Sequence, residues 1–274
     1  MTKIAYDPVK DRLANLVRNS GTLRRIFYFL LNLLFLRSWY LRRIIAQKGD
    51  VLDSLGNWDL LDAGCGFGQY DHFILKRFEN VHITSIDVKE SYLEDNKRFF
   101  LKEIEKERID FKLGDLLNLN LEKKFDLIIC IDVLEHIEDD QKVIQNLSSL
   151  LKKGGYFLMH SPSHLSEEDG DDDETFVGEH ARTGYSKKEI EEKMMIADLL
   201  PELTQYTYGK WGRRAWKISI KWPMLVLNKI KLWGLIPLAF YYPVILPITL
   251  LLNFADLLSK KKTGNGIFSI AKRI

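Results

Sequence analysis

The sequence has only two cysteines, Cys65 and Cys130, among its 274 residues. Two cysteines cannot form a disulfide framework, so we expect a reducing compartment and a packing role for both. The first 20 residues carry charges throughout and lack an apolar run of signal-peptide length, which favours the cytosolic side over export. With 46% hydrophobic and 28% charged residues, the composition also excludes a wholly disordered or collagen-like chain.

Net charge is also low, at +2, but the charges are unevenly distributed. Residues 1–48 carry ten Lys/Arg against two Asp/Glu, residues 187–274 carry fifteen against six, and residues 49–186 hold fifteen against thirty. Basic ends favour an anionic partner, either lipid headgroups or nucleic acid. Four tryptophans stand directly before a long apolar run, which is typical of a membrane interface, so we expect no nucleic-acid partner. These are Trp211, Trp216, Trp222 and Trp233.

Short β-branched runs alternate with longer amphipathic ones in the middle of the chain. This pattern is typical of an α/β fold with a parallel sheet, and no internal repeat interrupts it. The predicted strands are Trp58–Asp62, Val81–Asp87, Ile109–Leu113, Phe125–Ile131, Tyr156–His160 and Leu203–Tyr208, with a last strand-like piece at Gly266–Arg273. Helices are expected near residues 70–78, 90–107, 139–152 and 186–199.

A glycine-rich turn follows the first predicted strand. Gly64, Gly66 and Gly68 alternate there, two residues after Asp62. Glycines let the chain turn tightly and let a ligand approach the main chain, next to the unpaired N–H groups of the following helix. The spacing differs from the G-x-G-x-x-G of a dinucleotide-binding turn, which disfavours a nicotinamide oxidoreductase. The preceding Asp62 favours a cationic ligand over a pyrophosphate.

Two further acids follow the next two strands. Asp87 ends the second strand, nineteen residues after Gly68, where a carboxylate can accept hydrogen bonds from both hydroxyls of a ribose. Asp115 comes directly after the third strand, where it could contact an adenine amino group.

With these acids in register, the chain resembles the class I S-adenosylmethionine-dependent methyltransferases, in particular their small-molecule branch that acts on quinones and lipids. The matching segments are LLDAGCGFG at 60–68, SIDV at 85–88, GD at 114–115, FDLIICIDVLEHI at 125–137, GGYFLMHSPS at 154–163 and GEHARTGYSKKEI at 178–190. The resemblance implies a seven-stranded Rossmann-like sheet and S-adenosyl-L-methionine as cofactor. It places Asp62 and the glycines near the methionyl part, Asp87 at the ribose and Asp115 at the adenine, with Asp132 as a further cofactor-binding candidate.

Methyl transfer from a sulfonium is an in-line displacement that depends chiefly on positioning, but a hydroxyl acceptor also needs a base or a metal. The candidate bases are His136 and His160, with Asp132 beside them at the carboxyl edge of the sheet. Asp132, Glu135 and His136 resemble the E-x-x-E-H metal signature of some O-methyltransferases. Because Asp takes the first place, we assign no metal and keep these three residues as the candidates.

Tyr185 and Arg182 precede a predicted helix. They could orient an acceptor, which makes Tyr185 a catalytic candidate, or they could pin the acidic loop before them. That loop carries seven acids in the eight positions Glu167–Glu174 and is expected to be solvated.

The run Leu232–Ala255 has 24 residues without a charge, about 36 Å as one helix against a hydrocarbon core of about 30 Å. The strands on either side should join one sheet, so the segment must leave and return on the same side. We therefore expect it to enter one face of the membrane as two short helical legs, with bends near Pro243 or Pro247. Ile26–Leu36 is too short to span, and is either a buried helix or a second interfacial contact.

The sequence predicts four parts: N-terminal basic and apolar helices at 1–48, a methyltransferase core at 49–208, a membrane-interface helical insert at 209–263, and the final strand at 264–274. The predicted function is a peripheral or monotopic enzyme on the cytoplasmic side of a membrane, which methylates an oxygen of a lipophilic quinol, phenolic or lipid-like acceptor. Two alternatives stay open. One is a methyltransferase for a soluble metabolite whose apolar segment serves dimerisation, and the other is a non-catalytic membrane-surface binding protein with the same fold.

Overall fold

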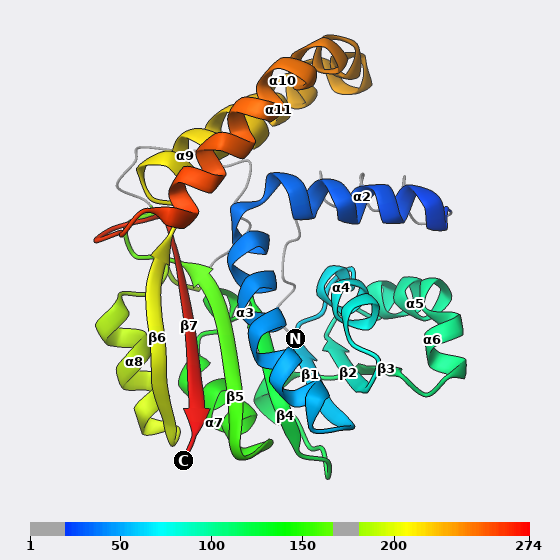
Figure 1. Ribbon diagram of the computed structural model, residues 1–274, viewed down its shortest axis with the longest axis vertical. Coiled ribbons are helices and arrows are strands. Elements are labelled where there is room, and N and C mark those ends of the chain that lie inside the picture. Colours follow the sequence, from blue (N-terminus) through cyan, green and yellow to red (C-terminus); the bar gives the residue numbers. More distant parts are fainter. Residues whose placement is uncertain (1–19, 167–180) are drawn as a thin grey trace.

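The computed structural model describes residues 20–166 and 181–274, so the acidic run Glu167–Glu174 and the start of the segment 178–190 lie outside it. One sheet of seven strands forms the centre, in the order β3-β2-β1-β4-β5-β7-β6, and only β7 runs antiparallel to its neighbours (Figure 1). The strands are β1 Trp58–Ala63, β2 Val81–Asp87, β3 Ile109–Leu113, β4 Phe125–Ile131, β5 Leu151–Pro162, β6 Leu199–Thr207 and β7 Gly266–Arg273. The predicted seven-stranded Rossmann-like sheet is confirmed.

Two of the strands begin earlier than their sequences indicate. β5 starts at Leu151. Its pairing with β4 is irregular between Phe125 and Leu127, and Gly154, with φ of +81°, lets the chain pass through this irregularity. β6 starts at Leu199 and includes Pro201, next to a shift in its register with β7. A proline is tolerated there because β6 is an edge strand.

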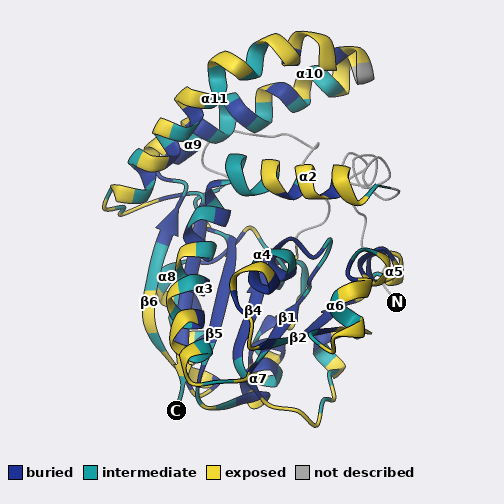
Figure 2. Cartoon of the chain, turned by 45° about the vertical axis from the view of Figure 1, so that its right-hand side comes forward, coloured by how far each residue is buried: buried dark blue, intermediate teal, exposed yellow. Residues whose placement is uncertain are grey.

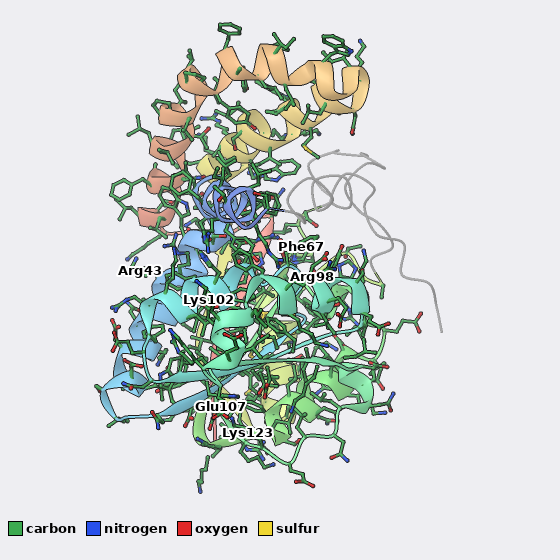
Figure 3. All side chains as sticks on the ribbon, turned by 90° about the vertical axis from the view of Figure 1, so that its right-hand side faces the viewer. Arg43, Phe67, Arg98, Lys102, Glu107 and Lys123 are labelled. Atoms are coloured by element: carbon green, nitrogen blue, oxygen red, sulfur yellow. The ribbon has the colours of Figure 1, made fainter. Side chains whose placement is uncertain are left out.

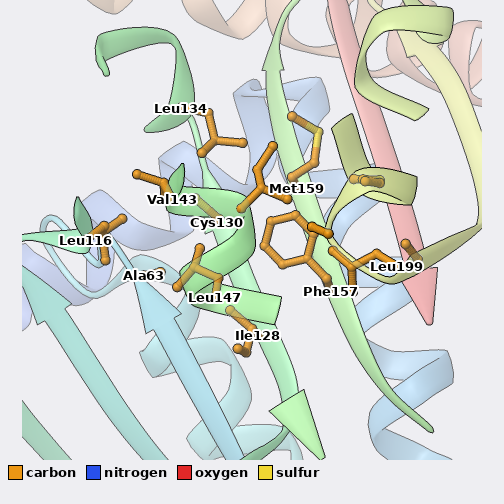
Figure 4. Packing of buried hydrophobic residues seen from close by; sticks show 14 of the residues in the cluster. Ala63, Leu116, Ile128, Cys130, Leu134, Val143, Leu147, Phe157, Met159 and Leu199 are labelled. Carbon is orange, nitrogen blue, oxygen red and sulfur yellow. The ribbon is translucent and has the colours of Figure 1, made fainter. Parts of the chain in front are cut away.

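Helices cover both faces of the sheet. In chain order, the α-helices of the described residues are α2 Gly21–Leu34, α3 Leu36–Ser54, α4 Gln69–Arg77, α5 Glu90–Phe99, α6 Leu101–Glu105, α7 Asp140–Ser149, α8 Lys187–Ile196, α9 Lys210–Trp216, α10 Trp222–Ile230 and α11 Leu235–Leu258. Buried side chains of α3, α4 and α5 pack on one face, and those of α7 and α8 pack on the other (Figure 4). Along β1, Leu60 belongs to the first cluster and Leu61 to the second, as the two-residue period of a strand requires.

The helix α2 turns the polar side chains of Arg24 and Tyr28 inward and several apolar side chains outward. Arg24 and Tyr28 are buried, whereas Ile26, Phe29 and Leu30 are exposed (Figure 2). The helix begins after Ser20, whose hydroxyl accepts a hydrogen bond from the Leu23 N–H. Its apolar face is therefore turned away from the core, which is the reverse of the usual arrangement.

The segment between β6 and β7 is a helical hairpin at the carboxyl end of β6 (Figure 1). Its first leg is α9, a π-helical turn at Lys217–Lys221, and α10; a 3₁₀ turn at Lys231–Gly234 leads to α11 as the second leg. The prediction of two short legs within the apolar run, with bends near Pro243 or Pro247, was wrong. Both prolines lie inside the single 24-residue helix α11.

The first leg supports α11 at the prolines. The hydroxyls of Tyr241 and Tyr242 donate to the carbonyls of Ile218 and Ser219, each at 2.8 Å, in the π-helical turn of the first leg. Each proline removes one backbone hydrogen bond from its helix, and packing against a neighbouring helix can offset that loss. The chain reverses instead where the two legs meet, at Lys231–Gly234.

A buried carboxylate, Asp256, anchors the base of the hairpin to the rest of the protein. It accepts hydrogen bonds from the Gly212 N–H at 3.0 Å and the Tyr40 hydroxyl at 3.1 Å, and the buried Lys261 ammonium lies 3.5 Å away. Gly212 is required there, because a Cβ atom would lie 2.5 Å from Leu36. Asp256 thus links α11, α9 and α3.

We expect Asp256→Ala to lower the free energy of unfolding by about 3–5 kcal/mol, because it leaves a buried ammonium without its acid. Urea denaturation measures this change. The matched control is Asp50→Ala, which removes an exposed pair with Arg77 and should cost less than about 1 kcal/mol. Equal losses in the two variants would contradict the anchoring role of Asp256.

Candidate functional site

The glycine loop after β1 has the backbone that its sequence predicts. Gly64, Gly66 and Gly68 have φ values of +94°, +51° and +68°, a region that other residues rarely adopt. A Cβ atom on Gly64 would lie 2.3 Å from Val133, so the loop after β1 packs directly on the loop after β4. By contrast, nothing lies within 4 Å of a Cβ built on Gly66. The loop is open at its middle glycine.

Asp87 closes one side of this loop. Its carboxylate accepts hydrogen bonds from the Gly66 and Lys89 N–H groups, each at 2.8 Å, and the side chain is buried. Burial raises the pKa of Asp87, and the backbone donors act against that rise. Each oxygen keeps a further lone pair that a ligand hydroxyl could use.

Asp62 lies on the other side of the loop. It is buried, and its Oδ2 has no hydrogen-bond partner among the described residues. Burial, followed by the nearby Asp71 carboxyl, raises its pKa well above the usual value. An acid of this kind would be stabilised by a cation.

The helix α2 is fastened to the glycine loop by polar contacts. Arg24 donates to the carbonyls of Phe67 and Asp95, each at 2.8 Å, and also to Asn96. The Tyr28 hydroxyl donates to the same Phe67 carbonyl. Figure 3 shows Phe67 next to α2, which is seen end-on. These contacts place an N-terminal helix over the loop.

A second polar cluster lies at the carboxyl ends of β4, β5 and β6. Asp132 follows β4 with φ of +52°, a strained conformation for a residue other than glycine. One of its oxygens pairs with Arg37 at the start of α3, and the other lies 2.6 Å from Nδ1 of His160 on β5. Nε2 of His160 lies 3.2 Å from the Thr207 hydroxyl on β6. A hydroxyl that donates to Nε2 leaves the proton on Nδ1, facing Asp132.

The two members of the Asp132–His160 pair differ in exposure. The side chain of Asp132 is 23% exposed, and that of His160 is 5% exposed. Burial alone would lower the pKa of Arg37, but the neighbouring groups, with Asp132 first, raise it above its usual value. The guanidinium therefore stays charged, and a ligand at this edge meets the Asp132 carboxylate before it meets the imidazole.

Two more buried groups border this cluster. Burial and then the charge of Asp132 raise the pKa of Glu135 to about 8, so its carboxyl is protonated at neutral pH. Glu135 is held by the Ser161 hydroxyl at 3.0 Å. The Tyr70 hydroxyl, in the first turn of α4, is buried and has no hydrogen-bond partner among the described residues. It interacts electrostatically with Arg37 and Asp132 in one half of the site and with Asp62 in the other.

Comparison with known proteins decides what this site belongs to. Residues 56–201, more than half of the chain, match the family described as methyltransferase domain. The chain belongs to this family. The family's methyltransferase domain is that of methyl-transferring enzymes, and its cofactor is S-adenosylmethionine.

Individual relatives match over shorter stretches. The chain is 35% identical over 105 residues to malonyl-[acyl-carrier protein] O-methyltransferase 1 of Ilyobacter polytropus, which is 38% of each protein. It is 32% identical over 97 residues to ubiquinone biosynthesis O-methyltransferase of Coxiella burnetii, which is 35% of this chain and 40% of the relative. The chain thus spans about two fifths of the length of the curated relatives that it matches.

A solved structure with a similar fold is that of magnesium protoporphyrin IX methyltransferase from Synechocystis with bound SAH. The TM-score is 0.56 at 13% identity, and the likeness covers 97% of this chain and all of that one. At this identity the likeness concerns the fold.

The residues of the glycine loop fit S-adenosylmethionine. The buried, unpartnered oxygen of Asp62 suits the cationic methionyl end, and Gly66 leaves open space at its Cβ position. Asp87 has acceptor capacity for a ribose diol. The assignments of Asp62, Gly64, Gly66, Gly68 and Asp87 as cofactor-binding residues remain predictions that this geometry supports. Asp115 is exposed and accepts from the Leu117 N–H at 2.9 Å, so its contact with adenine also stays a prediction.

The structure gives Tyr185 a different environment from the one expected of a catalytic residue. Its side chain is fully buried, and its hydroxyl donates to Asp140 at 2.6 Å. Arg182 also pairs with Asp140, at 3.1 Å, and its guanidinium lies over the Tyr185 ring. These contacts favour the pinning role over the acceptor-orienting one, because a hydroxyl buried in this way does not face a substrate.

The remaining candidates divide into those in the cluster and those beside it. Asp132 and His160 are brought together, whereas His136 lies partly exposed in the 3₁₀ turn Leu134–His136. No group of three His, Cys, Asp or Glu side chains in the two described ranges is arranged to hold a metal ion, so Asp132, Glu135 and His136 do not form a ligand set there. Cys65 and Cys130 are buried free thiols.

Four residues of the site have no signal in the sequence that points to it. Arg24, Arg37 and Thr207 reach it from segments distant in the chain, and Tyr70 follows the glycine loop without belonging to its motif. The one available hint was that Arg24 and Arg37 interrupt apolar stretches, where charged residues are usually paired.

We expect Asp87→Ala to weaken the binding of S-adenosylmethionine at least tenfold, because hydrogen bonds to a charged group are worth roughly 1.5–3 kcal/mol each. Isothermal titration calorimetry measures the dissociation constant. The control is Asp110→Ala, which changes an exposed carboxylate on β3 and should leave binding as in the wild type. Unchanged affinity in Asp87→Ala would show that the ribose lies elsewhere.

Proposed function

We propose that this protein transfers a methyl group from S-adenosylmethionine to an oxygen atom of a lipophilic small molecule, which it takes from the cytoplasmic leaflet of a membrane. The observation that carries the membrane part is the reversed polarity of α11. Three of its four buried residues are the polar Thr249, Asn253 and Asp256, whereas many of its large apolar side chains are exposed. In water this arrangement is unfavourable, and in contact with lipid it is favoured.

The exposed apolar residues of α11 recur every three or four positions and so form one stripe. They are Ile236, Phe240, Val244, Ile248, Leu251, Phe254 and Leu258, with the exposed Leu235 next to the first of them. The helix is long and apolar enough to cross a membrane, and only 11% of its most apolar 18-residue window is buried. Both ends of the hairpin return to the same edge of the sheet, however, which supports insertion into one face without crossing.

The helix α2 supports the same surface. Its exposed residues Leu23, Ile26, Phe29 and Leu30 lie opposite the buried Arg24. A hydrogen bond from Asn253 of α11 to the Leu34 carbonyl, at 3.5 Å, joins the two helices, and both lie at the carboxyl end of the parallel strands (Figure 1). We define the membrane-facing surface as these four residues together with the α11 stripe.

The basic and aromatic residues of the first leg suit an anionic headgroup layer. Lys210, Arg214 and Lys229 are exposed, as are Trp222 and Trp233. Lysines and arginines near a membrane surface gain about 1 kcal/mol each from anionic lipids, and tryptophan prefers the headgroup level. The cytoplasmic leaflet is the anionic one, which is why we propose that side.

The Asp132–His160 pair supports transfer to oxygen. An acceptor hydroxyl that donates to the partly exposed Asp132 carboxylate would lose its proton to that carboxylate as the methyl group arrives. Arg37 and Nδ1 of His160 hold the carboxylate in one orientation, and Thr207 fixes the imidazole behind it. The cofactor supplies an activated methyl group on sulfur, and the chain supplies position and a proton acceptor. The names of both curated relatives also specify O-methylation.

We expect Asp132→Asn and His160→Gln to lower kcat by about 10²–10⁴-fold, because proton transfer acts in the transition state. The binding of S-adenosylmethionine should change by less than about threefold on the same reasoning. Rates with a hydrophobic phenol as acceptor and calorimetric binding separate the two effects.

The comparison variant is His136→Gln, at the second candidate base. Full activity in this variant together with loss in His160→Gln assigns the base to the Asp132–His160 pair. The opposite pattern moves the base to His136.

We expect Phe240→Asp, Val244→Asp and Leu251→Asp, combined in one variant, to reduce binding to anionic vesicles at least a hundredfold. Each Asp opposes insertion by up to about 2.5–3.5 kcal/mol at the bilayer centre, and every 1.4 kcal/mol is tenfold. All three side chains are at least 65% exposed, so the fold should not suffer. Vesicle co-sedimentation measures the change.

A matched control replaces three other exposed apolar residues, Val51, Leu55 and Met195, by Asp and should bind vesicles as the wild type does. Light scattering of the same samples tests whether a second copy of the chain covers the stripe instead. If the wild type does not bind vesicles and is oligomeric, while the α11 variant is monomeric, the soluble alternative is supported and the membrane proposal is overturned.

A further inference from the structure

Two carboxyl groups lie buried beneath the glycine loop, and only one of them belongs to its motif. Asp62 is the second-last residue of β1, and Asp71 lies in the first turn of α4. The side chain of Asp71 is fully buried, and one of its oxygens would lie 3.3 Å from a Cβ atom on Gly68. Ser85 of β2 is paired with Asp62 in the parallel ladder, and its buried hydroxyl borders the same space.

Several buried oxygens of this group lack a hydrogen-bond partner. Oδ2 of Asp62, both oxygens of Asp71 and Oγ of Ser85 have no partner that meets hydrogen-bond geometry within the described residues. The two carboxyls interact with each other, and Asp71 also interacts with the Ser85 hydroxyl. Two ionised carboxylates in contact in a buried site repel each other, and one shared proton removes the repulsion.

Within residues 20–166 and 181–274, neither carboxyl forms an ion pair with a cation. The nearest cation is Arg24 of α2, whose guanidinium is occupied by the carbonyls of Phe67 and Asp95 and by Asn96. The other titratable neighbours are Tyr28 of α2, Cys65 of the loop, Tyr70 of α4 and Asp87 of β2, none of which is a cation. A cationic ligand could therefore supply the counter-charge that the pair lacks.

We propose that Asp71 is a positioning residue of the cofactor site that acts through Asp62: the two carboxyls share one proton, and they release it when the cationic methionyl end of S-adenosylmethionine binds beside Asp62. This inference rests on the proposed function. In this step a carboxyl O–H bond breaks and its proton passes to a water molecule, and the ligand cation balances the negative charge that remains on the pair.

The release of a proton ties cofactor affinity to pH. Burial raises the pKa of Asp71 to about 7 and that of Asp62 well above its usual value. Below that pH the pair holds its proton, and the cation must displace it. Affinity for S-adenosylmethionine then rises with pH by up to tenfold per unit and levels off above about pH 8. S-adenosylhomocysteine lacks the sulfonium charge, so its affinity should depend less on pH.

The experiment is calorimetry of S-adenosylmethionine binding at pH 6.5 in two buffers with different enthalpies of ionisation. The difference in observed heat gives the number of protons released. We expect about 0.5–1 proton per site in the wild type and less than about 0.2 in Asp71→Asn, where the amide can donate to Asp62 without a titratable proton. The control Asp110→Asn should release as many protons as the wild type.

Each result decides one point. Binding with no proton release in the wild type overturns the inference and leaves the proposed function standing, and so does equal release in Asp71→Asn. If the wild type does not bind S-adenosylmethionine at all, the proposed function itself fails. If Asp71→Asn does not fold, the wild-type dissociation constant at pH 5.5, 6.5 and 7.5 is the test, and an affinity independent of pH contradicts the shared proton.

Discussion

The buried guanidinium of Arg24 sets the arrangement on which the rest of the site depends. A charged group can be buried only if its donors are satisfied, and Arg24 achieves this with carbonyls of the glycine loop and of α5. This holds α2 over the loop and turns the other face of the helix outward. Since that other face consists of Ile26, Phe29 and Leu30, the requirement to satisfy one cation also produces an exposed apolar surface.

The same principle operates in the hairpin and at the carboxyl edge of the sheet. Asp256 is satisfied by α3 and α9, which leaves the apolar stripe of α11 outside. Arg37, just after the α2–α3 bend, reaches Asp132 and so connects the N-terminal helices to the pair with His160. The glycine loop, the Asp132–His160 pair and the hairpin are therefore each held to the N-terminal helices α2 and α3 by polar contacts.

The sheet and the glycine loop could be predicted from the sequence because both have local signals. β-branched runs of fixed length predict strands, and alternating glycines after a strand predict a positive-φ turn, as found at Gly64 and Gly66. The partners of buried polar groups could not be predicted, since they are set by which segments meet in three dimensions. Nothing near Tyr185 in the chain indicates that its hydroxyl is bound to Asp140, 45 positions away.

The prediction for α11 failed for a related reason. Prolines inside a helix are read as bends when the helix is considered alone. Here a second helix runs alongside, and Tyr241 and Tyr242 connect to it. The bend therefore lies where the first leg ends.

The two chain segments that connect the hairpin to the sheet lie next to each other. β6 and β7 are neighbours in the sheet, and the Asn265 N–H donates to the Tyr208 carbonyl at 3.1 Å, so the chain closes on itself just before the hairpin begins and just after it ends. Adjacent antiparallel strands need only a turn of a few residues between them. The 55 residues 209–263 therefore leave and re-enter the sheet at one point, so a change in their length would leave the register of β6 with β7 unaltered.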